Sequence, residues 1–281
     1  MGAFFETIPE SLIKWVLEQK VFWVSTAPLS GKGHVNVSPK GGQVFGIIGV
    51  DTFYYVDMTG SGCETISHLL EPGNGRITIL FNAFEGPPRI LRFWGKGRVL
   101  ENGTSQFNDI VERENIKIVP GIRSIIVVDI HQVGTSCGFS VPKFAFQEFR
   151  TTLDDYFKRK EDKYLAGNEK ESMDRYWALK SARSMDGLPG MERGLKAGRQ
   201  YQITPMKKMV GPWAPKNGVN LDIRRGFQLE HLIIIVLALL LAISLATHPA
   251  FQQQARTRIQ DVLLHVRAVP DALPSSVRLR G

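Results

Sequence analysis

The chain of 281 residues is 43% hydrophobic and 22% charged, which is ordinary for a globular protein. Its 35 Lys and Arg against 27 Asp and Glu give a net charge of +8, but no basic run exceeds three residues, so we expect a solvated basic surface and no nucleic-acid partner. Two cysteines are too few for a disulfide framework and form no metal-ligand pattern, which favours a reducing compartment and no metal.

The first twenty residues predict a helix and no secretory signal, because acids come early and no uninterrupted apolar core follows. The helix is expected over 7–20, with Thr7 as its cap and Pro9 in its first turn. One apolar face consists of Leu12, Ile13, Val16 and Leu17.

Short runs rich in Val, Ile, Phe and Tyr, separated by Gly, Pro and Asn, predict a series of strands. The expected strands are 21–27, 34–38, 44–50, 52–57, 76–84, 90–100 and 124–133. Two helices interrupt them, near 63–71 and 104–114. This spacing predicts a mostly β fold, a closed antiparallel barrel with helices packed on it.

The composition changes after about residue 148. Residues 149–183 are charged and helix-prone, and residues 184–228 are rich in Gly, Pro, Lys and Arg with little periodicity. We therefore assign 1–150 to the barrel domain, 151–190 to a helical extension and 191–230 to a basic linker.

An uncharged apolar run of sixteen residues occupies 232–247. As a helix it would be about 24 Å long, less than the roughly 30 Å hydrocarbon core, but flanking residues can snorkel and a bilayer can thin. A buried soluble helix is the alternative. Because the run is apolar on every side and follows a basic linker, we expect 231–248 to be a transmembrane helix, a single-pass C-terminal anchor. The large domain is then expected in the cytosol, and 249–281 forms a tail.

Small, hydroxylated and basic residues gather at two expected strand ends. The stretch "HVNVSPKGG" ends in Lys40 and two glycines, and "TGSGCET" places three hydroxyl groups where a helix begins near Cys63. A phosphate needs close backbone N–H donors and a cation, so the two stretches together predict a phosphate site if their strands are neighbours. Each stretch taken alone is also compatible with an ordinary turn, and "GSGCET" lacks the ending of a P-loop.

Four segments, in this order, resemble the pyridoxamine 5'-phosphate oxidase-like family of FMN-binding split barrels: "HVNVSPKGG", "YYVDMTGSGCETISHL", "GRITILFNAFEGPPRILRFWGKGRV" and "SCGFSVP". The resemblance covers roughly residues 5–150, and "SMDGLPG" at 184–190 is similar to a downstream part of one subgroup. It implies a six-stranded antiparallel Greek-key split barrel and a homodimer with FMN at the dimer interface.

The resemblance also implies a set of cofactor-binding residues. The flavin edge and phosphate would be lined by Val37, Ser38, Pro39 and Lys40. The phosphate turn would contain Ser61, Gly62, Glu64 and Thr65, and Arg92 would face the cofactor of the other subunit. The true oxidase has an Arg-Lys pair after this turn, where this chain has Gly62 and Cys63, so Lys40 or an arginine elsewhere must supply the positive charge.

No Ser-His-Asp or paired-carboxylate arrangement stands out, so no catalytic residue is assigned. FMN would carry the hydride chemistry of an oxidoreductase, and the protein would orient a small-molecule substrate that the sequence does not identify. The oxidase's substrate-contacting C-terminal segment has no clear counterpart, so vitamin B6 oxidation is not inferred. A non-catalytic module that binds flavin, deazaflavin or haem is the alternative function, and a purely structural membrane-tethered dimer is a third.

Overall fold

The structure is a computed structural model that describes residues 2–42 and 44–214, together with 236, 237, 240, 244, 247, 249 and 253. The chain divides into two compact units, residues 1–219 and 220–281. The candidate site lies in the first unit. The expected span 232–247 and tail 249–281 fall mostly outside the described residues, within which no helix is long and apolar enough to cross a bilayer.

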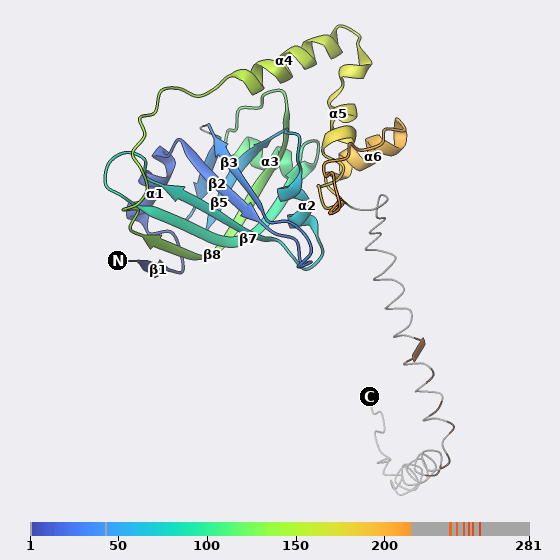
Figure 1. Cartoon of the computed structure of the whole chain (residues 1–281), viewed down its shortest axis with the longest axis horizontal. Helices are drawn as coiled ribbons and strands as arrows, with labels where there is room; N and C mark the ends of the chain where they lie inside the picture. The colour runs from blue at the N-terminus through green and yellow to red at the C-terminus, as the bar shows by residue number, and fades with distance from the viewer. Residues whose placement is uncertain are drawn as a thin grey trace, which may run out of the picture. The chain divides into compact units, whose positions relative to one another are not determined.

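Eight strands of the first unit form one antiparallel sheet (Figure 1). Across the sheet they run β3 (Asn36–Gly41), β2 (Val21–Thr26), β6 (Arg76–Asn82), β7 (Ile90–Glu101), β8 (Ile122–Ser136), β5 (Thr52–Met58) and β4 (Phe45–Ile48), while β1 (Ala3–Phe5) pairs with β8. The described sheet therefore has eight strands, one more than the seven expected from the residue pattern and two more than the six implied by the resemblance. The strands expected near 21–27, 52–57 and 90–100 match β2, β5 and β7 within one or two residues at each end.

The sheet curls around an aromatic core, which gives a half-barrel consistent with a split barrel. The ring of Phe22 on β2 lies 5.1 Å from that of Phe45 on β4 and 5.5 Å from that of Tyr55 on β5, although these strands belong to opposite halves of the sheet. Phe53, Phe81 and the other rings named here except Phe45 are fully buried. Burying one such side chain stabilises the fold by roughly 1.5–3 kcal/mol.

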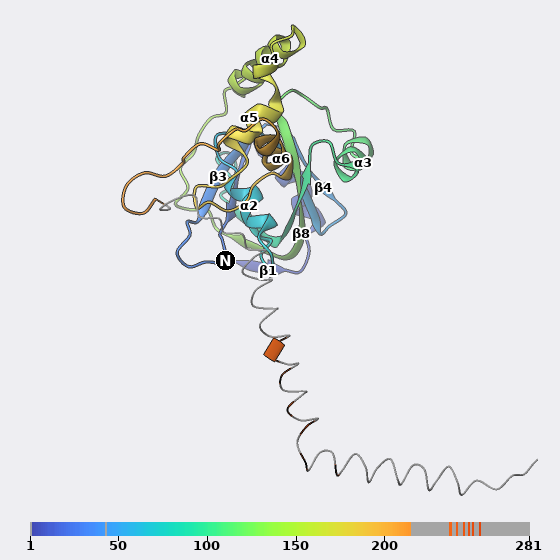
Figure 2. The same ribbon diagram turned by 90° about the vertical axis from the view of Figure 1, so that its right-hand side faces the viewer.

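The helices are α1 (Glu10–Glu18), α2 (Glu64–Leu70), α3 (Ser105–Arg113), α4 (Thr152–Leu165), the 3-10 turn η1 (Glu169–Glu171), α5 (Met173–Lys180) and α6 (Glu192–Gln200). Helices α1, α2 and α3 lie between strands in the sequence, and the remaining helices come after the last strand. Figure 2 shows α5 and α6 beside α2. Helix α6 lies inside the range 191–230 that was expected to be a linker. Its Gly194 and Ala197 are buried, so this part of the range is packed structure.

The first helix is shorter than expected, and the predicted Thr7 cap is wrong. Helix α1 begins at Glu10, and Pro9 precedes it in an extended conformation with no side-chain cap. Proline fixes its own φ and cannot donate a hydrogen bond, so it is well suited to this boundary. The predicted apolar face is confirmed in part: Leu12 and Val16 are buried and Ile13 is partly buried, whereas Leu17 is exposed.

Candidate functional site

A buried carboxylate on β5, that of Asp57, connects the two segments that were expected to form a phosphate site. Lys40 Nζ lies 2.8 Å from Asp57 Oδ1, and Arg123 Nε on β8 lies 2.7 Å from Asp57 Oδ2. Arg123 also donates through Nη1 to the carbonyl of Gly62, at 2.6 Å. The end of β3 and the turn between β5 and α2 therefore lie on two sides of one ion-pair network, Lys40–Asp57–Arg123.

This network carries a net positive charge. Burial alone would raise the pKa of Asp57, but Arg123 and then Lys40 outweigh burial and lower that pKa to about 2. Asp57 is therefore ionised at neutral pH, and two cations accompany one anion. The Lys40 side chain is 21% exposed, whereas Arg123 is 5% exposed and Asp57 is fully buried, so the accessible charge of the network is that of Lys40.

An unpartnered hydroxyl group lies beside the network. Tyr55 is fully buried, and its Oη has no hydrogen-bond partner among the described residues. Lys40 Nζ lies 5.6 Å from the centre of the Tyr55 ring. Burial, followed by the charge of Asp57, raises the pKa of Tyr55 well above its ordinary value, so this hydroxyl remains a neutral donor. A buried donor without an acceptor costs free energy that a bound acceptor would recover.

The four expected residues of β3 divide between the two faces of the sheet. Lys40 and Ser38 lie opposite Phe22 and Val24, which are buried, so they face the interior of the half-barrel. Val37 and Pro39 alternate with them and are exposed on the outer face. The structure therefore brings Lys40 and Ser38 to the network and separates Val37 and Pro39 from it.

Asn36, which sequence analysis did not select, links β3 to the start of α2. It accepts a hydrogen bond from Ser38 Oγ at 3.2 Å and donates through Nδ2 to Thr65 Oγ1 at 3.0 Å. Thr65 is buried. These contacts hold the inner face of β3 against the turn, so Thr65 acts there as a link between two segments.

The remaining turn residues differ in their surroundings. Ser61 is exposed, and the backbone N–H groups of residues 60–63 have no acceptor within the described part of the chain. Glu64 Oε1 accepts from the backbone N–H of Met185 at 3.1 Å. A Cβ at Gly62 would lie 2.1 Å from Glu64 Oε2, so an arginine could not replace Gly62 unless Glu64 moved.

Arg92 lies apart from the network. Cross-strand register pairs it with Leu80, which is itself opposite Trp23, and these residues alternate with the buried interior positions. Arg92 Nη1 donates to Ser136 Oγ at 3.3 Å. The structure therefore places Arg92 on the outer face of the sheet, as it does Val37 and Pro39.

A C-terminal segment that sequence analysis did not assign to the site, residues 173–208, covers the turn (Figure 2). Trp177 Nε1 on α5 donates to Thr59 Oγ1 at 2.9 Å, and Lys208 Nζ lies 3.7 Å from Cys63 Sγ. Burial raises the pKa of the Cys63 thiol, so this group is inert at neutral pH. The same segment makes two more contacts. The backbone N–H of Met185 donates to Glu64 Oε1, and Asp186 Oδ1 lies 2.6 Å from His34 Nδ1.

These residues can hold a small anion, with one opposing feature. Lys40 supplies the accessible positive charge, residues 60–63 supply backbone N–H donors, and Tyr55 Oη is a buried donor. The carboxylate of Glu64 opposes an anion at the same turn. The residues present fit a phosphate group, with the accessible charge of Lys40 where the true oxidase has an Arg-Lys pair, and with buried Arg123 bonded to the Gly62 carbonyl of the turn.

Comparison with known proteins places the chain in a family. A curated relative from Aspergillus flavus, the pyridoxamine 5'-phosphate oxidase family protein ustO, is 34% identical over 251 residues, which cover 84% of this chain and 96% of that protein. The chain belongs to the pyridoxamine 5'-phosphate oxidase family, and the resemblance seen in the sequence is confirmed. No protein-family model matches the chain.

Solved structures resemble part of the chain. HupZ from Group A Streptococcus is 18% identical and covers 45% of this chain and 92% of its own, with a TM-score of 0.34. The FAD binding protein from Mycobacterium smegmatis is 11% identical (46% and 96% coverage, TM-score 0.33). An FMN-binding protein from Syntrophomonas wolfei subsp. wolfei is 15% identical (43% and 80% coverage, TM-score 0.30).

Proposed function

We propose that the protein binds FMN and acts as a flavin-dependent oxidoreductase. The observation that carries this proposal is the Lys40–Asp57–Arg123 network, which leaves one positive charge beside a turn whose backbone N–H groups have no acceptor among the described residues. Family membership supports the same proposal, because the curated relative is a pyridoxamine 5'-phosphate oxidase family protein.

In this proposal the phosphate of FMN lies between Lys40 and the N–H groups of residues 60–63. Arg123 holds the turn in place through the carbonyl of Gly62, and Asp57 positions both cations. FMN, when bound, would supply hydride-transfer chemistry. The chain's own residues would bind and orient it, and we assign no residue as an acid or base.

The test is an absorption spectrum of the purified full chain, followed by titration with FMN and with riboflavin. We expect a yellow protein whose flavin is released on denaturation, and tighter binding of FMN than of riboflavin. Lys40→Ala should weaken FMN binding at least about tenfold, since one charge-assisted hydrogen bond to phosphate contributes roughly 1.5–3 kcal/mol. Riboflavin affinity should change little.

Two controls separate charge from folding in that experiment. Lys32→Ala removes a lysine from an exposed loop and should leave FMN affinity unchanged. Lys40→Arg keeps the positive charge beside Asp57 and should retain most of the affinity. A colourless wild-type chain that takes up no added FMN would overturn the proposal, and equal affinity of Lys40→Ala and wild type would remove Lys40 from the site.

A second candidate function is a non-catalytic module for flavin, deazaflavin or haem. The observation that favours it is the cover over the turn, since residues 173–208 occupy the side of Thr59, Cys63 and Glu64. NADH or NADPH should reduce bound flavin in an oxidoreductase, and a substrate should reoxidise it. A bound flavin that neither cofactor reduces would favour the non-catalytic module, and the spectrum itself distinguishes flavin, deazaflavin and haem.

We further propose a homodimer tethered to a membrane by residues 232–247, with the large domain in the cytosol. The exposed outer-face residues Val37 and Pro39, together with Arg92, support a dimer in which this face meets a second copy. Sedimentation of the full chain in detergent should give twice the mass of one chain. A single-chain mass at micromolar concentration would contradict the dimer.

A further inference from the structure

The C-terminal part of the first unit, residues 173–214, carries much of the positive charge of the protein. It contains eight Lys and Arg against three Asp and Glu, a net charge of +5, where the whole chain has +8. Each of the three acids already has a basic partner: Asp174 has Arg193, Glu192 has Lys196 and Asp186 has His34. The other six basic side chains form no ion pair within the described part of the chain: Arg175, Lys180, Arg183, Arg199, Lys207 and Lys208.

Large apolar side chains are exposed in the same segment. Trp213 is 86% exposed and Val210 is 89% exposed, and Leu179 and Met206 are exposed to a smaller degree. The other four tryptophans of the chain are buried or half-buried. Single exposed apolar residues are common on proteins, whereas a group of them that includes a bare indole marks an interaction surface.

Hydrogen bonds bring two of these apolar residues together with lysines. The N–H of Met206 donates to the carbonyl of Leu179 at 2.9 Å, and Lys180 Nζ lies 2.9 Å from Met206 Sδ. Lys207 follows Met206 and is exposed. The end of α5 and the stretch after α6 therefore lie side by side, and each contributes one apolar side chain and one lysine.

A turn carries the other two apolar side chains. The N–H of Ala214 donates to the carbonyl of Gly211 at 3.1 Å, and Gly211 has a φ of +83°, a conformation that glycine adopts without strain. Val210 and Trp213 flank this glycine in the sequence. We call the whole group the 179–213 surface, and it consists of Leu179, Lys180, Met206, Lys207, Val210 and Trp213.

The composition of the 179–213 surface matches that of an anionic bilayer. Tryptophan side chains favour the boundary between water and hydrocarbon. Lysine places its apolar stem on the hydrocarbon side of this boundary and its ammonium group among anionic headgroups. The surface is therefore complementary to such a bilayer both in charge and in polarity.

The sequence keeps this surface within reach of a membrane if the tether proposed above is correct. Eighteen residues, 214–231, separate Trp213 from the first residue of the apolar run 232–247. Even fully extended, they span at most about 65 Å. Insertion of the run would make the contact between the 179–213 surface and the bilayer an intramolecular event, so that a weak contact would suffice.

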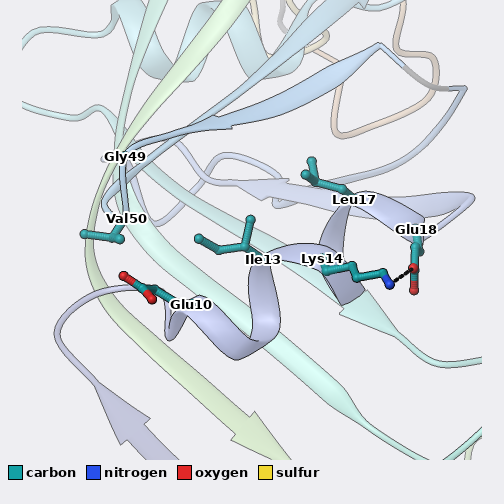
Figure 3. Close-up of a pocket in the computed structure, with 7 residues that line it drawn as sticks. All are labelled: Glu10, Ile13, Lys14, Leu17, Glu18, Gly49 and Val50. Carbon is teal, nitrogen blue, oxygen red and sulfur yellow. Dashed lines mark ion pairs between the residues drawn. The ribbon is translucent and has the colours of Figure 1, made fainter.

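A hollow beside α1 provides a contrast, because it is also apolar but has the wrong charge. This hollow of about 680 Å³ is lined by Ile13, Leu17 and Val50, with one lysine, Lys14, between two carboxylates of α1 (Figure 3). Lys14 already forms an i,i+4 ion pair with Glu18 at 4.0 Å. The hollow therefore has more negative than positive groups, and an anionic bilayer would repel it.

A second exposed apolar stretch, residues 139–149, belongs to a different face. The ring of Phe144 lies 5.2 Å from that of Phe84, which in turn lies 6.0 Å from that of Trp23. Trp23 alternates with the buried Phe22 and so lies on the outer face of the sheet, which is proposed above to meet a second copy. The 179–213 surface contains no residue of the sheet, so the two surfaces are separate.

We propose that the 179–213 surface binds the anionic headgroups of a phospholipid bilayer, with Trp213 and Val210 at the boundary of the hydrocarbon and Lys180 and Lys207 on the phosphate and carboxylate groups. This proposal extends the membrane tether under the proposed function. It adds a contact made by the folded domain itself, and that contact does not require residues 232–247 to insert.

The test is sedimentation of the full chain with phospholipid vesicles. The chain carries Leu240→Arg, because a charge in the middle of the apolar run opposes its insertion. One set of vesicles is phosphatidylcholine alone, and the other contains about 30% phosphatidylserine, both in about 0.1 M salt. We expect binding to the anionic vesicles to be at least about tenfold tighter than to the neutral ones, and to be lost in about 0.5 M salt.

Paired variants on this background locate the contact. Lys180→Gln with Lys207→Gln should weaken binding to the anionic vesicles about 25-fold, since one lysine near an anionic surface contributes about fivefold. The matched control is Lys32→Gln with Lys158→Gln, which removes the same charge from exposed positions elsewhere and should change binding less than about twofold. Circular dichroism checks that each variant is folded.

Tryptophan fluorescence reports on the apolar part of the contact. Anionic vesicles should shift the emission to shorter wavelength, and Trp213→Phe should remove this shift while it retains most of the binding. Trp213→Ser should weaken binding about tenfold, because serine has no apolar ring to place at the boundary.

Three results would overturn the proposal: no binding to anionic vesicles, equal binding to both kinds of vesicle, or equal binding of the Lys180/Lys207 pair and its control pair. An unchanged emission shift in Trp213→Phe would remove Trp213 from the contact and contradict the proposal as stated. FMN affinity should be the same in both lysine pairs, so failure here leaves the flavin proposal intact. Insertion of 232–247 is tested separately, by flotation of the chain without Leu240→Arg.

Discussion

The carboxylate of Asp57 lies in the interior of the protein between two cations. It has no exposed surface, and its charge is tolerated because Arg123 and Lys40 each contribute a short hydrogen-bonded ion pair. Removing one partner of a buried pair leaves an uncompensated charge and typically costs 3–5 kcal/mol, about as much as losing a large core side chain. This position therefore determines both local stability and the charge that faces a ligand.

The lowered pKa of Asp57 predicts a particular sensitivity to acid. A folded pKa of about 2 lies below the ordinary value, so the ionised carboxylate stabilises the fold above about pH 4, and this stabilisation is lost as the pH falls toward 2. The loss should amount to about 2 kcal/mol in the free energy of unfolding. Urea unfolding between pH 2.5 and 5 measures it, and Asp57→Asn should flatten the dependence.

Asp129→Asn is the matched control, because Asp129 is an ion-paired carboxylate on the neighbouring strand that is half exposed. Exposed pairs contribute about 0–1 kcal/mol, so this variant should keep nearly the whole wild-type dependence on pH. If Asp57→Asn lost stability on acidification as steeply as the wild type, the network would not be the origin of the effect.

At the scale of elements, the motif "SMDGLPG" joins the segment after α5 to the turn before α2. Gly190 is buried in this motif, and a Cβ there would lie 2.3 Å from the carbonyl oxygen of Ser181 and 2.7 Å from Cys63 Sγ. Gly190→Ala should therefore lower the free energy of unfolding by about 1–3 kcal/mol, as overpacking of a close contact does. Thermal unfolding followed by circular dichroism measures the change.

A glycine in open space provides the comparison for that variant. At Gly31 an added Cβ meets nothing within 4 Å, so Gly31→Ala should change the melting temperature little. If both variants melted together with the wild type, residues 181–190 would not pack on Cys63 as the structure has them. Loss of FMN binding in Gly190→Ala alone would show that the cover also supports the proposed site.

The strands were predictable from sequence because their residues alternate, as in β2, where Phe22 and Val24 are buried between half-buried neighbours. Strand β1 was missed because three residues show no period, and it exists through its pairing with β8. Helix α6 was missed because its two interior glycines weaken a helical pattern, and tertiary packing compensates for them.

The candidate site was predictable only in part, for a related reason. Lys40 and the glycine-serine turn carry local signals of phosphate binding, whereas Arg123 lies 66 residues from Asp57 and borders an apolar strand with no motif around it. The sequence does contain one signal of this contact. Asp57 and Arg123 are opposite charges in otherwise apolar strands, and a buried carboxylate requires a buried cation. This rule predicts that Asp57 has a buried cationic partner, but only the fold shows that the partner is Arg123.

At the scale of the whole molecule, the first unit contains the proposed flavin site, so the membrane proposal for 232–247 can be tested with variants outside that unit. The full chain should float with liposomes in a density gradient and resist extraction with carbonate. Leu240→Arg places a charge in the middle of the apolar run, where insertion costs about 2.5–3.5 kcal/mol, and should shift most of the protein to the soluble fraction. Gln253→Arg adds the same charge beyond the run and should still float.

Equal flotation of both variants would mean that another part of the chain holds the protein at the bilayer. Failure of the wild type to float would rule out the anchor and leave the flavin proposal intact.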